Sequence, residues 1–279
     1  MKIFDCFMYF DEEIVLDLRL NILDKYVDYF IIVESIYTHR GDKRNLKFDP
    51  KKFTKFQNKI KYFIYDEIPE KIEPILENDN ENDKARKYIM NAVYRENGQR
   101  DFISSGLKDA KDNDLILISD VDEIPNLEEI RGLNKYKFTV FQQKLFYYKF
   151  NLQNITTPFW FGSKICKKKY LKSPQWLRDQ KIKKNSFWNL FKTQWNIIQN
   201  GGWHFSFLMD AKQIKSKLNS FAHEEFNNSN FNNLDKINYS IEHNIDLFNR
   251  EFSYKKINFD ENFPKYILDN KEKFKNWII

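Results

Sequence analysis

Short apolar runs alternate with segments of helical apolar spacing through the first half of the chain. The run Tyr29–Val33 has the length of a strand and carries no charge, which is typical of a strand buried on both faces. The pattern predicts strands at residues 2–8, 29–33, 60–64 and 115–118, and helices at residues 12–23, 83–94 and 99–110, with Gly98 separating the last two. Such alternation predicts an α/β fold with a mostly parallel central sheet flanked by helices.

The second half of the chain is less regular. Strands are expected at residues 138–142, 146–150 and 160–166, and helices at 210–219, 234–248 and 264–277. Asp210 suits the N-cap of the first of these helices, and Pro264 suits the first turn of the last. No internal repeat, low-complexity tract or Gly/Ser/Pro-rich linker divides the sequence. We therefore expect residues 1–279 to form a single domain with a helical C-terminal segment.

Charge and cysteine content narrow the class of protein. The net charge is +6, and residues 131–203 contain fifteen Lys and Arg but one acid, Asp179. This basic section suits an anionic ligand, and since it contains no recognisable nucleic-acid motif, no nucleic-acid partner is expected. Cys6 and Cys166 have no metal-ligand spacing, which predicts free thiols. The sequence shows neither a signal peptide nor an apolar membrane span, so a cytoplasmic location is expected.

The strongest chemical signal is the acidic motif Asp120-Val121-Asp122-Glu123, which directly follows the strand predicted at residues 115–118. Ligands of an open parallel sheet bind beyond the carboxyl ends of its strands. Two carboxylates at positions i and i+2 can share one Mg²⁺ or Mn²⁺ ion, whose remaining ligands are often phosphate oxygens. Such a metal would neutralise a departing diphosphate. The alternative is an acidic turn that merely ends a strand.

The residues around this motif resemble glycosyltransferase family 17. Ile118-Ser119-Asp120-Val121-Asp122-Glu123-Ile124-Pro125 is similar to the family's signature, and the similarity spans nearly the whole chain. The other matching stretches are Phe4–Phe7, Val27–Ser35, Arg95–Arg100, Gly202–Ser206, Ser220–His223 and Pro264–Leu268. One departure is Phe205, which stands where the family pattern has a cysteine.

This resemblance implies a GT-A (Rossmann-like) fold, with a nucleotide-sugar-binding half at residues 1–125 and an acceptor-side half at residues 126–279. It also implies a UDP-sugar donor, carrying N-acetylglucosamine or a close relative, an inverting mechanism and a divalent metal, Mn²⁺ or Mg²⁺. The acceptor would be an oligosaccharide, polysaccharide or glycoconjugate. The alternatives are an inactive carbohydrate- or nucleotide-sugar-binding protein and a sugar nucleotidyltransferase. No glycine-rich phosphate loop follows the first strand, which argues against the nucleotidyltransferase.

A metal site would include three side chains under this resemblance: Asp120, Asp122 and His204. The resemblance points to His204 as the late histidine that many GT-A enzymes use as a metal ligand. The alternative is a core histidine that is hydrogen-bonded to backbone.

Five further residues are candidate donor contacts together with Asp120: Glu34, Thr38, Lys43, Arg95 and Arg100. Glu34 ends a buried strand, where its carboxylate can accept from a ribose hydroxyl or a uracil N–H. Thr38 and Lys43 lie in a loop that can close over the donor or stay solvated. Arg100, placed near a helix start, can hold a phosphate or uracil oxygen. If the helix is unbroken, Glu96 and Arg100 form a structural ion pair at i and i+4 instead.

An inverting transfer needs a general base to deprotonate the acceptor hydroxyl. Asp179 is the favoured candidate, since it is the only acid between Glu129 and His204, and it follows residues 173–178, which look like a loop. Glu123 and Glu224 are the other candidates. The competing interpretation pairs Asp179 with Arg178 on a solvated surface.

Overall fold

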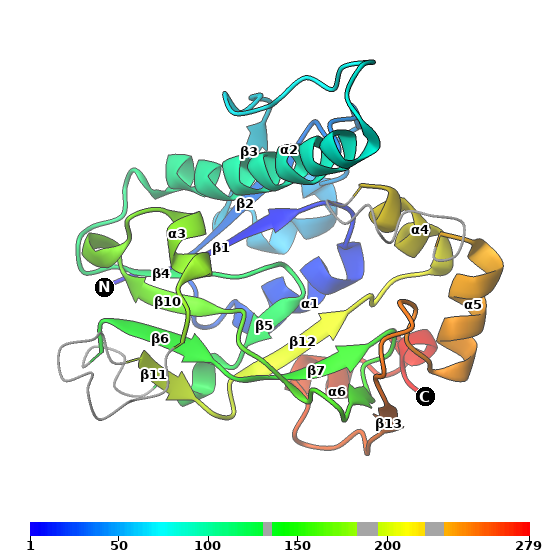
Figure 1. Ribbon diagram of the computed structural model, residues 1–279. Coiled ribbons are helices and arrows are strands. Elements are labelled where there is room, and N and C mark those ends of the chain that lie inside the picture. The colour runs from blue at the N-terminus through cyan, green and yellow to red at the C-terminus, as the bar shows by residue number, and fades with distance from the viewer. Residues whose placement is uncertain (131–135, 183–194, 221–231) are drawn as a thin grey trace, which may run out of the picture.

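The computed structural model describes residues 1–130, 136–182, 195–220 and 232–279. The strands of its larger sheet are β1 (Ile3–Tyr9), β2 (Tyr29–Ser35), β3 (Ile60–Tyr65), β4 (Leu115–Ile118), β6 (Phe138–Phe141), β10 (Lys164–Lys167) and β11 (Trp195–Ile198). In these ranges the sheet is seven-stranded, in the order β11-β6-β10-β4-β1-β2-β3 (Figure 1). Strands β4, β1, β2 and β3 run parallel, whereas β10 is antiparallel to both β4 and β6.

Alternate side chains of the parallel strands enter two separate cores, one on each face of the sheet. Phe7, Phe30 and Leu117 belong to the core that contains helix α1 (Glu13–Leu23). Their neighbours Cys6 and Ile31 belong to the opposite core, which contains the 3₁₀ helix Phe102–Leu107. Because successive strand residues point to opposite faces, an uninterrupted apolar run is what a strand covered on both sides requires.

A second sheet packs beside the first and holds the later part of the chain. Its strands are β5 (Glu123–Pro125), β7 (Gln143–Tyr147), β8 (Leu152–Asn154), β12 (Gly202–Ser206) and β13 (Tyr254–Lys256), and β9 (Phe159–Trp160) pairs with β7. Strand β12 lies between β7 and β5, parallel to the first and antiparallel to the second. The fold is thus mixed α/β with two mixed sheets, and the expected mostly parallel sheet holds for the first half of the chain but not for the second.

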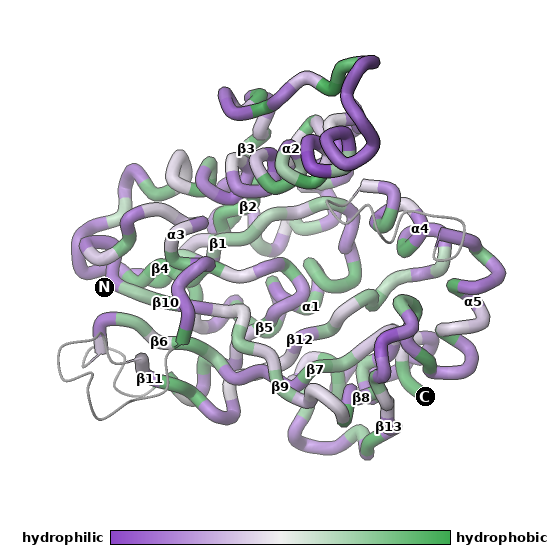
Figure 2. The backbone as a smooth tube through the Cα atoms, viewed as in Figure 1, coloured by the Kyte–Doolittle hydropathy of each residue, from purple (hydrophilic) through white to green (hydrophobic). Residues whose placement is uncertain are grey.

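Helices cover both sheets. In Figure 1, α1 and α2 (Glu81–Asp101) lie on opposite sides of the larger sheet. Helices α4 (Ala211–Ser220) and α5 (Leu234–His243) pack on the second sheet, and the short helices are α3 (Pro174–Asp179) and α6 (Lys265–Asp269). Figure 2 shows the hydrophobic residues gathered along the central strands and hydrophilic ones along the chain before α2. Among the residues described, no helix is both long and apolar enough to cross a membrane.

Several predicted boundaries are wrong for identifiable reasons. The break at Gly98 does not exist, because α2 continues to Asp101 and uses the missing side chain for close packing. A Cβ on Gly98 would lie 2.3 Å from the Tyr65 hydroxyl. The helix expected at 234–248 ends at His243, since Asn244 adopts the left-handed conformation of a C-cap.

Other differences come from tertiary packing. The predicted strand 160–166 is two strands, β9 and β10, which belong to different sheets. The predicted strand 146–150 is shifted to Gln143–Tyr147, and Tyr148 follows it with a positive φ of 58°. The predicted helix 264–277 is reduced to α6, after which the chain turns so that Phe274 packs against Phe150 and Tyr266.

A fully buried arginine connects α1 to the loop after β4. Arg19 forms an ion pair with Asp5 of β1, with nitrogen–oxygen distances of 2.5 and 2.7 Å. Its remaining N–H groups donate to the Ser119 hydroxyl and to the carbonyls of Asp120, Val121 and Glu123 at 2.6–3.3 Å. The single side chain of Arg19 therefore fixes the backbone of the acidic motif.

We predict that Arg19→Met lowers the free energy of unfolding by about 3–5 kcal/mol, because it leaves the buried Asp5 carboxylate unpaired. Urea denaturation measures the change. The double variant Asp5→Asn/Arg19→Met should lose less than the sum of the two single variants, since neither charge remains. Lys25→Met, which removes a cation that is 64% exposed, is the control. Equal losses for Arg19→Met and the control would contradict the prediction.

Candidate functional site

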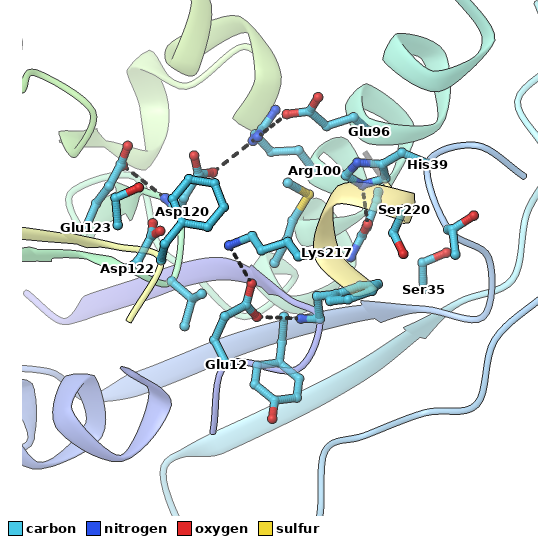
Figure 3. Close-up of a pocket in the computed structure, with 18 of the residues that line it drawn as sticks. Glu12, Ser35, His39, Glu96, Arg100, Asp120, Asp122, Glu123, Lys217 and Ser220 are labelled. Carbon is cyan, nitrogen blue, oxygen red and sulfur yellow. Dashed lines mark hydrogen bonds and ion pairs between the residues drawn. The ribbon is translucent and has the colours of Figure 1, made fainter. Parts of the chain in front are cut away.

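The carboxyl ends of β1, β2 and β4 open into a cavity of about 420 Å³. Ligands of open α/β sheets bind at this edge. Residues from β12, α2 and α4 complete the wall, and Figure 3 shows the side chains that converge there. The lining includes Glu12, Ser35, Thr38, His39, Glu96, Gln99, Arg100, Asp120, Asp122, Glu123, Trp160, His204 and Lys217.

Asp120 is held between two arginines. Its carboxylate lies 3.2 Å from Arg100 Nη2 and 2.7 Å from Arg178 Nη2. Burial opposes ionisation of Asp120, but the charges of Arg178 and Arg100 outweigh that effect and hold its pKa well below the usual range. Arg100 also pairs with Glu96 at 2.8 Å, as expected for positions i and i+4 of an unbroken helix. Arg100 thus lies at the end of α2, not at a helix start, and still faces the cavity.

Glu123 is a fully buried carboxylate with strong hydrogen-bond donors on both oxygens. Arg178 donates to its two oxygens at 2.7 Å each, and the indole N–H of Trp160 donates to Oε1 at 2.5 Å. Its Oε2 also accepts from the backbone N–H of Asp120 at 3.0 Å. Because Arg178 contacts both Glu123 and Asp120, one guanidinium fixes the two carboxylates relative to each other.

His204 reaches the acidic motif through strand pairing. In the antiparallel pair of β5 and β12, His204 lies opposite Glu123, and Phe205 N donates to the Asp122 carbonyl at 2.9 Å. This pairing places His204 Nε2 3.6 Å from Asp122 Oδ1. Burial lowers the pKa of His204, but the negative charge of Asp122 outweighs it, so that the net shift is upward. Burial raises the pKa of Asp122 and His204 lowers it, and the net shift is downward.

The donor set at this point fits a divalent cation that has two protein ligands. The 3.6 Å separation of His204 Nε2 and Asp122 Oδ1 exceeds a hydrogen bond. Adjacent ligands of an octahedral ion with bonds of about 2.1 Å lie about 3.0 Å apart, so these two atoms would have to move slightly closer together to share one ion. His204 Nδ1 is buried without a hydrogen-bond partner in the described part of the chain.

Asp120 is placed differently from the other two predicted metal ligands, because Arg100 and Arg178 engage its two carboxylate oxygens. Residues 1–130, 136–182, 195–220 and 232–279 contain no group of three His, Cys, Asp or Glu side chains spaced to hold a metal. A third ligand would therefore come from a bound molecule or from water, as is common for Mg²⁺ and Mn²⁺.

The predicted donor contacts divide into those that face the cavity and those that do not. Thr38 lines the cavity, whereas Lys43 is exposed and lies outside the lining. Arg95 lines a small neighbouring pocket, where it donates to the carbonyls of His39 and Arg40 at 3.1 and 3.0 Å. Arg95 therefore supports the loop that carries His39.

Glu34 is fully buried, and its carboxylate is engaged within the protein. It accepts from the backbone N–H groups of Lys47 and Phe48 at 2.7 and 3.0 Å and from the Tyr62 hydroxyl at 2.9 Å. Arg44 pairs with it at 3.0 Å. The structure thus uses Glu34 to anchor the segment after β2.

The candidate bases lie in three different places. Glu123 is part of the cavity wall. Asp179 ends α3, is exposed, accepts from Gln175 Nε2 at 2.8 Å and lies outside the cavity lining. Glu224 lies outside the described residues. The alternative pairing of Asp179 with Arg178 does not occur, because Arg178 turns toward Asp120 and Glu123.

The contacts that Arg178, Trp160 and Lys217 make in this site were not predicted from the sequence. The segment before Asp179 looked like a loop, yet Ser173 followed by Pro174 is a helix-start signal, and the Ser173 hydroxyl caps α3.

Lys217 pairs with Glu12 at 3.1 Å across the cavity (Figure 3). Burial lowers the pKa of Lys217, but the charge of Glu12 outweighs it and raises the pKa overall.

Comparison with known proteins identifies the class. The sequence profile of glycosyltransferase family 17 matches residues 1–278, essentially the whole chain. The chain therefore belongs to glycosyltransferase family 17, and it is a glycosyltransferase, an enzyme that uses a sugar donor and a glycan acceptor. No curated protein and no solved structure shows significant similarity to it.

Lys164 holds the segment that carries Arg178, and its pKa should make the free energy of unfolding depend on pH. Its ammonium donates to the carbonyls of Arg178 and Gln180, where burial, reinforced by the charge of Arg178, lowers its pKa from 10.5 to about 8. The unfolded chain therefore binds more protons between these values, and the free energy of unfolding should rise with pH in that window. Relative to Lys164→Met, the wild type should gain stability as pH increases from about 8 toward 10.5.

Urea denaturation of both proteins over this pH range measures the difference. Lys167→Met, on the same strand but partly exposed, is the control for loss of a lysine. A wild-type-minus-variant difference that stays constant with pH would contradict the assignment.

Proposed function

We propose that this glycosyltransferase moves N-acetylglucosamine or a closely related sugar from a UDP-sugar to a hydroxyl of an oligosaccharide, polysaccharide or glycoconjugate. We further propose that it has a GT-A arrangement, needs Mn²⁺ or Mg²⁺, and inverts the anomeric centre. The observation that carries the proposal is the pair formed by Asp122 and His204. It fits a divalent cation at the carboxyl edge of a parallel sheet, where a nucleotide sugar would lie.

Asp122 and His204 would hold the metal, which when bound supplies positive charge to the diphosphate of the donor. Lys217 and Arg100 add fixed cations to the same cavity. Both are ion-paired with carboxylates, so their positions are set before the donor arrives. Fixed charges of this kind stabilise a developing negative charge without reorganisation.

The opposite part of the cavity suits a nucleoside. Ser35, Thr38, His39 and Gln99 present polar groups there, and Figure 3 shows Ser35 and His39 across the cavity from Asp122 and Glu123. Burial lowers the pKa of His39, which favours the neutral imidazole, and its Nε2 lies 3.2 Å from Gln99 Oε1. Neutral donors and acceptors of this type match the edges of a uracil base and a ribose.

Glu123 is the candidate base that lines the cavity. Arg178 and Trp160 engage its two oxygens, so a base role requires one of these hydrogen bonds to open. With the bonds closed, Glu123 instead positions Trp160 and Arg178. The base role of Asp179 stays a prediction, and its place outside the cavity lining gives it no support.

We predict that UDP binds in a metal-dependent way and that Asp122→Asn or His204→Ala weakens its affinity in Mn²⁺ by roughly tenfold or more, because each removes a metal ligand. Isothermal titration of UDP in Mn²⁺ and in EDTA measures this. In EDTA the wild type and both variants should bind UDP with similar, weaker affinity.

Glu128→Gln, which changes a carboxylate that is 63% exposed, is the control and should behave as the wild type. Two results would contradict the proposal. One is UDP binding that ignores metal in the wild type. The other is a metal dependence that survives in both site variants.

A further inference from the structure

His39 belongs to a loop after β2 that the protein holds without using the imidazole. Thr38 N donates to the Asp42 carbonyl at 2.8 Å, and Gly41 N donates to the Thr38 carbonyl at 2.9 Å. Arg95 of α2 donates to the His39 carbonyl at 3.1 Å. Gly41 has a φ of +109°, and a Cβ there would lie 2.6 Å from Arg95 Nη2, so this close contact needs a glycine. The backbone that carries the imidazole is therefore fixed by other groups.

The imidazole lines the cavity, and a chain of hydrogen bonds sets its tautomer. Gln99 of α2 is buried, and its Nε2 donates to the Val33 carbonyl at 3.0 Å. This bond fixes the orientation of the amide, because only the NH₂ group of an amide can donate to a carbonyl. Gln99 Oε1 therefore faces His39, whose Nε2 lies 3.2 Å away. An amide oxygen only accepts, so the hydrogen of a neutral imidazole must lie on Nε2.

The second ring nitrogen of His39, Nδ1, is thereby an acceptor. Burial lowers the pKa of His39 and outweighs the charge of Glu96, which acts in the opposite direction, so the neutral imidazole is favoured. A neutral imidazole with its hydrogen on Nε2 carries a lone pair on Nδ1. The protein thus presents an acceptor of fixed type on a residue of the cavity wall.

The edge of a pyrimidine base is a ligand that such an acceptor distinguishes. Uracil has an N–H at position 3, which is a donor between two carbonyl acceptors. Cytosine has nearly the same shape, but its N3 is an acceptor and carries no hydrogen. An acceptor nitrogen of the protein pairs with the N3–H of uracil, whereas against cytosine two lone pairs face each other. A site built to bind an N–H group discriminates strongly against an analogue that lacks it.

We propose that His39 Nδ1 accepts the N3–H of the uracil of the donor and so selects a uridine nucleotide over a cytidine nucleotide. The proposal rests on the proposed function, in which Asp122 and His204 hold the metal and the diphosphate. Figure 3 shows His39 across the cavity from Asp122, the side proposed for the nucleoside. Gln99 is a positioning residue, because it acts by keeping the hydrogen on His39 Nε2.

The test compares UDP and CDP by isothermal titration in Mn²⁺ with the full chain. The wild type should bind UDP about a hundredfold more tightly than CDP. His39→Ala should weaken UDP binding by about tenfold and strengthen CDP binding, because alanine neither accepts from uracil nor opposes cytosine. His39→Asn should bind both nucleotides, since an amide can present either its oxygen or its NH₂ group near the position of Nδ1.

The ratio of the UDP and CDP affinities is the decisive quantity, because a loss of structure would weaken the binding of both nucleotides alike. Gln99→Met removes the acceptor that fixes the tautomer, so this ratio should fall although His39 is intact. His243→Ala, which removes an exposed histidine at the end of α5, is the control and should keep the wild-type ratio.

Two results would overturn the role of His39. One is a wild type that binds UDP and CDP equally, and the other is a preference for UDP that survives in His39→Ala. Metal-dependent binding of UDP would in both cases still support the proposed function. A wild type that binds neither nucleotide would overturn the proposed function and the role of His39 with it.

Discussion

The buried guanidinium of Arg19 is the interaction on which the arrangement of the site depends. It neutralises Asp5 inside the sheet and is itself fully buried, so its remaining N–H donors must be satisfied by the protein. They are satisfied by Ser119 and by the carbonyls of the acidic motif. The three closely spaced carboxylates of this motif would repel one another in a free loop. Here the motif is held by its backbone, and its side chains are left to face the cavity.

A second constraint is that the buried carboxylates of the acidic motif must be balanced by positive charge. Arg178 and Arg100 compensate Asp120, Arg178 also compensates Glu123, and Asp122 pairs with His204. Paired buried charges cost far less than isolated ones. In consequence Asp120 and Glu123 are engaged by arginines, whereas Asp122 and His204 face one another at 3.6 Å. The cavity therefore joins this anchored acidic wall to a side lined by the neutral polar residues Ser35, Thr38 and Gln99.

The sequence predicted the elements whose patterns are local. Strands β1 to β4, helix α1 and the position of the acidic motif follow from uninterrupted apolar runs and helical spacing, because burial on two faces leaves that signature. The partners of the motif could not be predicted in this way. The motif contacts Arg19, Arg178 and Trp160, which are 37 to 104 residues away in the sequence. His204 comes close to the motif because β12 pairs with β5, a strand of only three residues. Gly98 misled the helix prediction because it serves packing against Tyr65.

The most direct test of this account is a crystal grown with UDP and Mn²⁺ and measured at the manganese absorption edge. The account predicts one strong anomalous peak at about 2.1–2.3 Å from Asp122 and His204, with the diphosphate completing the coordination. Density for UDP without such a peak, or a peak that contacts neither side chain, would contradict it.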